Sequence, residues 1–131
     1  MDGTIVICDR YAFSGIAFST SKGLSYEWCR APDVSLPAPD LTLFLHITPE
    51  AAKARGGYGE ERYEKEEMQR VVGQVFQRIG REMVEDGGKW VDVDAGRERD
   101  VVSEELWHIV EPLIHGVHSP LQQLWTDKMQ V

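Results

Sequence analysis

The chain has 131 residues, enough for one hydrophobic core with little room for a second. Its 14 Lys and Arg against 22 Asp and Glu give a net charge of -8, which argues against nucleic acid as a partner because phosphate binding draws on a basic face. No run suits a membrane span or secretory signal, and Cys8 and Cys29 lack metal or redox spacing. We expect an intracellular protein with reduced, buried thiols.

The predicted elements of the first half alternate between strand and helix. Runs of β-branched and bulky apolar residues predict strands over residues 4–8 and 41–47, and a weaker run predicts a third over residues 89–93. Between the first two we expect a helix near residues 14–21 and then a proline-rich connection, residues 32–40, that cannot be helical. Strands that alternate with helices imply βαβ units and a parallel sheet.

The second half is predicted to be mainly helical. Thr48 is a good N-cap and Pro49 suits the first helical position, so a helix is expected to begin there. A long helix is predicted over residues 64–86, ended by two glycines, and a last helix over residues 98–114. The apolar stripe of the long helix comprises Met68, Val71, Val72, Val75, Phe76, Ile79 and Met83.

Several familiar signatures are absent from the sequence. The phosphate-binding pattern Gly-x-x-x-x-Gly-Lys-Ser/Thr needs a Gly-Lys step, and the one present, Gly88-Lys89, is followed by tryptophan. His115 and His118 have the spacing of metal ligands on a helix but no acidic or thiol neighbour, so we expect no metal there. Four tryptophans are expected to be packing residues and not to stack on a ligand: Trp28, Trp90, Trp107 and Trp125.

One candidate site follows the first predicted strand, where Asp9-Arg10-Tyr11 precedes Ser14-Gly15. Ligands in open α/β sheets bind at the carboxyl ends of the strands. Arg10 can hold a phosphate with two hydrogen bonds, and Asp9 can hold a metal-bound water or orient the guanidinium. The residues alone are equally compatible with a structural Asp-Arg pair that closes a strand-to-helix turn.

A second candidate lies in residues 55–63. Arg55 and Arg62 flank three glycines, and Tyr63 follows directly. Mobile glycines between guanidiniums suit a lid that closes over phosphates and excludes water. The alternative is an exposed glycine-rich loop whose arginines pair with the neighbouring glutamates.

These residues together resemble the thymidylate kinases of the eukaryotic type. The resemblance rests on five segments in matching order and spacing: residues 9–18 (DRYAFSGIAF), 28–34 (WCRAPDV), 36–41 (LPAPDL), 57–64 (GYGEERYE) and 120–125 (PLQQLW). It implies an α/β fold with the parallel, helix-flanked sheet of a P-loop kinase, incomplete because the N-terminal strand and the P-loop are absent. Residues 1–131 would be about the carboxyl-terminal two thirds of the domain, with residues 55–63 as its lid.

The resemblance also implies an activity, the transfer of the γ-phosphate of ATP to dTMP with Mg²⁺ to give dTDP. Arg10 would bind the dTMP phosphate, and Asp9 would hold the magnesium through water. In the lid, Arg55 and Arg62 would approach ATP and Tyr63 would close over dTMP. The nucleoside pocket would comprise Ser14, Gly15, Phe18 and Ser19. The full-length protein would be a homodimer of the cytoplasm or nucleus, with no nucleic-acid or membrane partner.

The missing parts of the family pattern lead to two further expectations. The P-loop lysine and amides supply the main charge contacts to the ATP phosphates, so this chain alone is expected to lack dTMP kinase activity. A parallel sheet without its central strand leaves backbone groups and apolar surface uncovered, so we expect low stability. The alternative reading is a non-catalytic remnant that binds nucleotide weakly or assembles with a full-length subunit.

Overall fold

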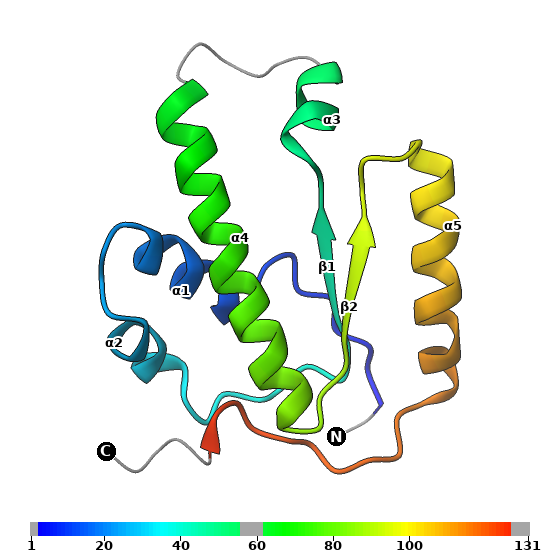
Figure 1. Cartoon of the computed structure of the whole chain (residues 1–131). Coiled ribbons are helices and arrows are strands. Elements are labelled where there is room, and N and C mark those ends of the chain that lie inside the picture. The colour runs from blue at the N-terminus through cyan, green and yellow to red at the C-terminus, as the bar shows by residue number, and fades with distance from the viewer. Residues whose placement is uncertain (1–2, 56–61, 127–131) are drawn as a thin grey trace.

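The structure is a computed structural model that describes residues 3–55 and 62–126, with the backbone alone for residues 62–65. Helices precede, separate and follow the two strands along the chain (Figure 1). The elements are α1 (Ala12–Ser21), α2 (Tyr26–Arg30), the 3-10 turn η1 (Ala31–Asp33), β1 (Thr42–His46), α3 (Pro49–Ala54), α4 (Arg62–Glu85), β2 (Trp90–Asp94), α5 (Arg99–Val110) and the 3-10 turn η2 (Glu111–His115).

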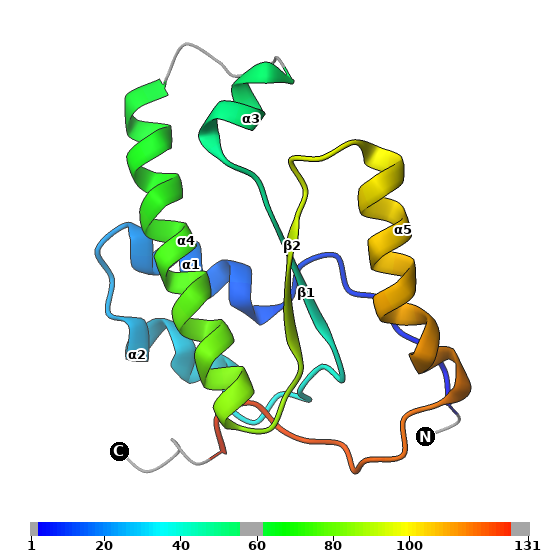
Figure 2. The same cartoon turned by 45° about the vertical axis from the view of Figure 1, so that its right-hand side comes forward.

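The strands β1 and β2 form a parallel sheet in which Thr42 lies opposite Trp90 and His46 opposite Asp94. The helices α4 and α5 lie on opposite sides of the two strands (Figure 2). Phe44 of β1 stacks on Phe76 of α4 with ring centroids 4.8 Å apart, which fixes α4 on its side of the sheet. A parallel sheet between helices confirms the predicted α/β class and the predicted second and third strands.

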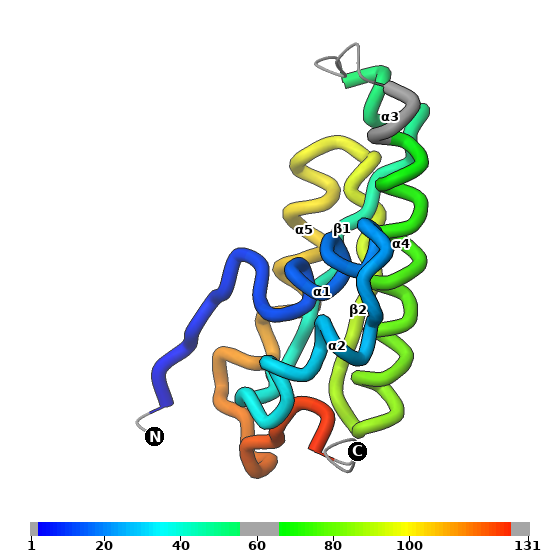
Figure 3. Tube along the Cα trace, turned by 90° about the vertical axis from the view of Figure 1, so that its left-hand side faces the viewer, coloured from blue at the N-terminus to red at the C-terminus, as the bar shows by residue number. Residues whose placement is uncertain are grey.

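The predicted strand over residues 4–8 is wrong. Residues 3–8 belong to neither helix nor strand, and Figure 3 shows this segment running away from the body of the molecule. Ile5, Val6 and Ile7 are 62%, 75% and 89% exposed. An apolar, β-branched run favours a strand only where another strand lies beside it, and in the part of the chain that the structure describes β1 and β2 pair with each other. Cys8, predicted to be buried, is exposed with this segment.

The core lies between α1, α4 and the last described residues. Phe13, Ile16 and Ala17 of α1 are buried, as is Tyr26 of α2. The buried apolar side chains of α4 confirm much of its predicted stripe, and they are Val72, Val75, Ile79 and Met83. Because one apolar face of α4 packs on α1 while Phe76 reaches the sheet, α4 joins the two parts of the fold.

The segment over residues 122–125 returns to this core. It lies antiparallel to residues 35–38, with three backbone hydrogen bonds of 2.8 Å each, and Pro37 pairs with Gln123. Trp125 is fully buried at its end, edge-on to Phe13 at a centroid distance of 6.0 Å. Trp28 and Trp107 are 68% and 51% exposed, so the expectation that they are packing residues is wrong for these two.

The last predicted helix is shorter than expected. The α-helix α5 ends at Val110 and the chain continues as η2. Pro112 lies at the start of η2, and a proline in a helix interior removes a hydrogen bond and clashes with the preceding turn. The α-helical part therefore stops before the position that the apolar spacing alone indicates.

Candidate active site

Arg10 has a backbone conformation that few non-glycine residues adopt. Its φ is +66°, in the left-handed region, and it is an exposed residue that precedes Tyr11, the N-cap of α1. This conformation costs on the order of 1–3 kcal/mol and persists only where surrounding contacts enforce it. Ser35 and Trp125 also have a positive φ, but Arg10 is the one of the three that the sequence proposes as a ligand-binding residue, and such strain is concentrated at ligand sites.

Tyr11 connects this strained residue to the rest of the fold. Its hydroxyl donates a hydrogen bond to the Pro37 carbonyl oxygen at 2.9 Å. Its own carbonyl oxygen accepts from the Ser14 amide at 3.3 Å, which closes the first turn of α1. Burial, together with the nearby acidic groups of Cys8 and Asp33, raises the pKa of the Tyr11 phenol, so the hydroxyl stays protonated and continues to donate.

The remaining predicted substrate residues lie on one half of α1. Because Phe13, Ile16 and Ala17 face the core, helical spacing turns the other half of α1 away from α4. A Cβ added at Gly15 would meet no atom within 4 Å, which shows that the space beside the helix is open there. That half of the helix carries Ser14, Gly15, Phe18 and Ser19. These four residues thus share one half of α1, although Phe18 is partly buried and packs against the core.

Arg55 is held in place by backbone carbonyls. It is the residue at the carboxyl end of α3, and its Nη2 donates to the carbonyl oxygens of Ala95 and Arg97 at 2.6 and 2.7 Å. Both acceptors lie in the loop that follows β2. Arg55 therefore joins α3 to this loop.

A hollow of about 700 Å³ opens beside Arg55, past the carboxyl ends of β1 and β2. Its lining includes Leu45, Arg55, Gly96, Arg97, Val102 and Leu106. This is the edge at which ligands bind in open α/β sheets. Its lining also includes Arg99 and Glu98, so apolar walls stand beside three guanidiniums and one carboxylate, which suits a flat ligand that carries negative charge.

The loop beside this hollow is fixed by its own side chains. Asp94 Oδ1 accepts from the Gly96 amide at 2.8 Å, and Arg97 Nε donates to the Asp94 carbonyl oxygen at 3.0 Å. Arg97 also forms an ion pair with Glu105 of α5. Sequence reasoning missed Gly96 and Arg97, although an Asp two residues before a Gly after a strand is a typical turn pattern.

Part of the predicted lid is outside the described residues. Gly57, Gly59 and their neighbours lie within residues 56–61, about which the structure says nothing. Arg62 and Tyr63 begin α4, but their side chains are likewise outside the description. The roles predicted for Arg62 and Tyr63 therefore remain predictions.

A buried carboxylate in α4 was missed by sequence reasoning. Glu82 is 8% exposed and accepts hydrogen bonds from the Tyr26 hydroxyl at 2.9 Å, from Arg30 Nη1 at 3.1 Å and from Trp125 Nε1 at 3.1 Å. Burial and the adjacent Glu82 carboxylate raise the pKa of the Tyr26 phenol well above its usual range. One signal was available, because Glu82 stands three residues after Ile79 on the apolar side of the helix.

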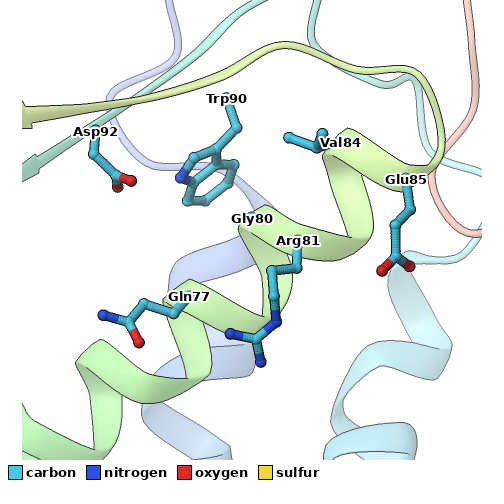
Figure 4. Close-up of a pocket in the computed structure, with 7 residues that line it drawn as sticks. All are labelled: Gln77, Gly80, Arg81, Val84, Glu85, Trp90 and Asp92. Carbon is cyan, nitrogen blue, oxygen red and sulfur yellow. The ribbon is translucent and has the colours of Figure 1, made fainter.

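A second hollow, of about 540 Å³, lies between α4 and the first half of β2 (Figure 4). Its lining includes Gln77, Gly80, Arg81 and Trp90. The indole of Trp90 lies so close to Gly80 that a Cβ there would be 2.8 Å from Trp90 Nε1. Gly80 is therefore required for packing, and this hollow lies away from the carboxyl ends of the strands.

No three His, Cys, Asp or Glu side chains gather as a metal site among residues 3–55 and 66–126. No helix of residues 3–55 and 62–126 is long and apolar enough to cross a membrane.

The fold and this site define an α/β protein whose candidate ligand-binding residues lie beyond the carboxyl ends of a parallel sheet and along the neighbouring α1. The family model for thymidylate kinase matches residues 1–106. The chain belongs to the thymidylate kinase family, as its sequence motifs predicted.

Individual relatives agree with the family match. The thymidylate kinase of Schizosaccharomyces pombe is 47% identical over 122 residues, which are 93% of this chain and 57% of that protein. The human thymidylate kinase is 38% identical over 125 residues, covering 94% of this chain and 58% of that protein. The solved structure of Candida albicans thymidylate kinase aligns with a TM-score of 0.65 at 33% identity, over 87% of this chain and 58% of that chain. The chain thus spans slightly more than half the length of these relatives.

Proposed function

We propose that this chain provides the dTMP side of a thymidylate kinase, the enzyme that transfers the γ-phosphate of ATP to dTMP and forms dTDP and ADP. The observation that carries the proposal is Arg10, an exposed guanidinium on a strained backbone at the start of α1. The side of α1 that faces away from the core begins directly after it. Family membership supports the substrate, because the relatives are named thymidylate kinases.

Each substrate residue has a physical role in this proposal. Arg10 donates charge-assisted hydrogen bonds to the dTMP phosphate. The open half of α1 holds the nucleoside, with Phe18 against the base, Ser14 and Ser19 beside polar groups, and Gly15 where close approach is needed. Tyr63, at the start of α4, closes over the bound dTMP.

ATP would occupy the other half of the site. The hollow beside Arg55 accepts the base and ribose, and the carbonyls of the loop after β2 hold Arg55 as one of its walls. Arg62, with the lid over residues 55–63, would approach the phosphates. Positioning and charge neutralisation are the main requirements for phosphoryl transfer, and these residues supply part of both.

Asp9 is the residue proposed to hold Mg²⁺. Magnesium at nucleotide sites usually keeps several waters and takes one or two protein carboxylates together with substrate phosphates. One exposed carboxylate beside the phosphate-binding arginine fits that donor set through water. The ion supplies neutralisation of phosphate charge when it is bound.

The donor side of the reaction is incomplete within these 131 residues. The sequence contains no Gly-x-x-x-x-Gly-Lys-Ser/Thr, and removing even one comparable donor costs about 10²–10³ in rate. We therefore propose that the 131-residue chain binds dTMP without turning it over. The family resemblance further suggests a homodimer of the cytoplasm or nucleus. Assembly with a longer subunit is the second candidate, favoured by the exposed apolar side chains of Ile5, Val6 and Ile7.

The proposal is tested by dTMP binding to the purified chain, measured by isothermal titration calorimetry. Arg10→Ala should weaken binding about 10- to 100-fold, since hydrogen bonds to charged groups contribute about 1.5–3 kcal/mol. The matched control is Arg81→Ala. It removes an exposed arginine that lies on α4, far from α1 in the sequence, and should leave the affinity unchanged. Equal affinities for wild type and Arg10→Ala would contradict the proposal.

Turnover is measured separately by coupled ADP release. We expect no dTMP-dependent signal from the 131-residue chain. Turnover would contradict the inactivity part of the proposal while leaving the binding part intact. Recovery of a longer thymidylate kinase subunit bound to the chain in stoichiometric amounts would support the second candidate.

A further inference from the structure

The positive φ of Arg10 must be enforced by contacts of the residues before it or of the residues after it in the chain. On the preceding side, Ile7, Cys8 and Asp9 are exposed and belong to no helix or strand of the described residues. Exposed backbone of this kind provides few contacts that could keep an L-residue at a positive φ. The conformation is therefore determined from the following side, which begins with Tyr11.

Tyr11 is attached to the fold at three points. Its ring lies edge-on to Phe13 at a centroid distance of 5.9 Å, and Phe13 is 4% exposed in the core. Its carbonyl oxygen closes the first turn of α1 through the Ser14 amide. Its hydroxyl reaches 26 positions along the chain to the Pro37 carbonyl oxygen. The first two contacts fix the start of the helix, and the third fixes the direction of the side chain.

The acceptor of the phenol is itself firmly anchored. Residues 35–38 are bonded to residues 122–124 by three backbone hydrogen bonds of 2.8 Å. The next residue, Trp125, is fully buried and donates to the buried carboxylate of Glu82. The Pro37 carbonyl is thus tied through the carboxyl-terminal segment to α4, and a phenol bonded to it has little freedom to move.

From these contacts we propose that Tyr11 is a positioning residue, whose hydrogen bond to Pro37 holds Arg10 in the left-handed conformation that presents its guanidinium to the phosphate of dTMP. The proposal rests on the proposed function of Arg10. It adds a second residue, which touches no ligand, and a specific carbonyl as its partner.

The first test uses Tyr11→Phe, which removes only the hydroxyl, and compares the affinities for dTMP and thymidine by calorimetry. Loss of one hydrogen bond that positions Arg10 should lower the affinity for dTMP about 3- to 10-fold. The affinity for thymidine should stay unchanged, because thymidine has no phosphate. Equal losses of affinity for dTMP and thymidine would indicate a purely structural role of the hydroxyl and would overturn the proposal. Tyr26→Phe removes the same group from the Glu82 cluster and is the matched control, expected to leave the dTMP-to-thymidine ratio unchanged.

A double-mutant cycle separates this proposal from the proposed function. If Tyr11 acts through Arg10, adding Tyr11→Phe to Arg10→Ala should weaken dTMP binding no further. Additive losses would overturn the positioning role while leaving Arg10 as the phosphate ligand. If Arg10→Ala changes nothing, the proposed function itself fails.

A third measurement needs no ligand. Trypsin cleaves after arginine and lysine, so cutting between Arg10 and Tyr11 reports how firmly that bond is held. The cleavage rate is normalised to that of the same bond in the urea-unfolded chain. Tyr11→Phe should raise this normalised rate at least about 3-fold. The reason is that losing one hydrogen bond of about 1 kcal/mol increases the population of the locally open state about 5-fold. Cleavage after the exposed Lys22 should stay unchanged. Equal increases at both sites, or none at either, would overturn the proposal.

Discussion

The buried carboxylate of Glu82 supports a specific prediction about stability. Its side chain is 10% exposed and that of Arg30 is 11% exposed, with 3.1 Å between Arg30 Nη1 and Glu82 Oε1. Glu82→Ala would leave the Arg30 charge buried without this partner and would remove the acceptor of the Tyr26 hydroxyl and the Trp125 indole N–H. Breaking a buried ion pair by removing one partner typically costs about 3–5 kcal/mol. For a domain stabilised by about 5–15 kcal/mol, that loss brings the chain close to unfolding.

The assay is urea unfolding followed by tryptophan fluorescence, because Trp125 loses its buried environment when the cluster opens. Glu82→Gln keeps one acceptor oxygen while removing the charge. We therefore expect it to lose less free energy of unfolding than Glu82→Ala, and to remain folded if the alanine variant does not. Arg70→Ala, which breaks an exposed pair with Glu67 on the same helix, is the control and should cost at most about 1 kcal/mol. A loss below about 1 kcal/mol in Glu82→Ala would refute the view that this cluster stabilises the fold.

Two further predictions concern α4 and the alkaline pH range. Gly80→Ala should destabilise the folded chain by about 1–3 kcal/mol, because the new Cβ would meet the Trp90 indole. Gly73→Ala on the same helix would place a Cβ that meets no atom within 4 Å, so it should stabilise the folded chain by up to about 1 kcal/mol. Urea unfolding measures both changes. The pKa of Tyr26 is raised in the folded state, so its contribution is complete below the unfolded value of about 10 and is lost progressively as pH rises above it. The melting temperature of wild type should therefore fall more steeply above pH 10 than that of Tyr26→Phe, and parallel curves would contradict this.

Local signals in the sequence predicted elements whose causes are also local. The helix expected at Thr48 is present, and the Thr48 hydroxyl caps it by accepting from the Ala51 amide at 3.2 Å. The two glycines after α4 end it as expected, with Gly87 at a φ of +88°. Caps and left-handed stops depend on residues within one turn of each other, so one sequence is enough to predict them.

Predictions that depended on distant partners were less successful. The run over residues 4–8 has strand composition, but a strand also needs a neighbour, and the two described strands pair with each other. Glu82 was not singled out because its three donors lie 43 to 56 positions away along the chain. The hydrogen bond of Arg55 to a loop 40 residues further on was likewise not anticipated, and its predicted place in a lid stays a prediction.

The sequence by itself determined the family, the α/β class and the identity of the candidate phosphate ligand, since these depend on motif order and on periodicity along the chain. Only the tertiary structure decided which apolar runs are buried, that Arg10 is held at a positive φ, and that Tyr11 bonds to Pro37. The reason is that burial and backbone strain depend on which segments pack together. Residues far apart in the chain, such as Tyr11, Pro37 and Trp125, provide those contacts only after folding.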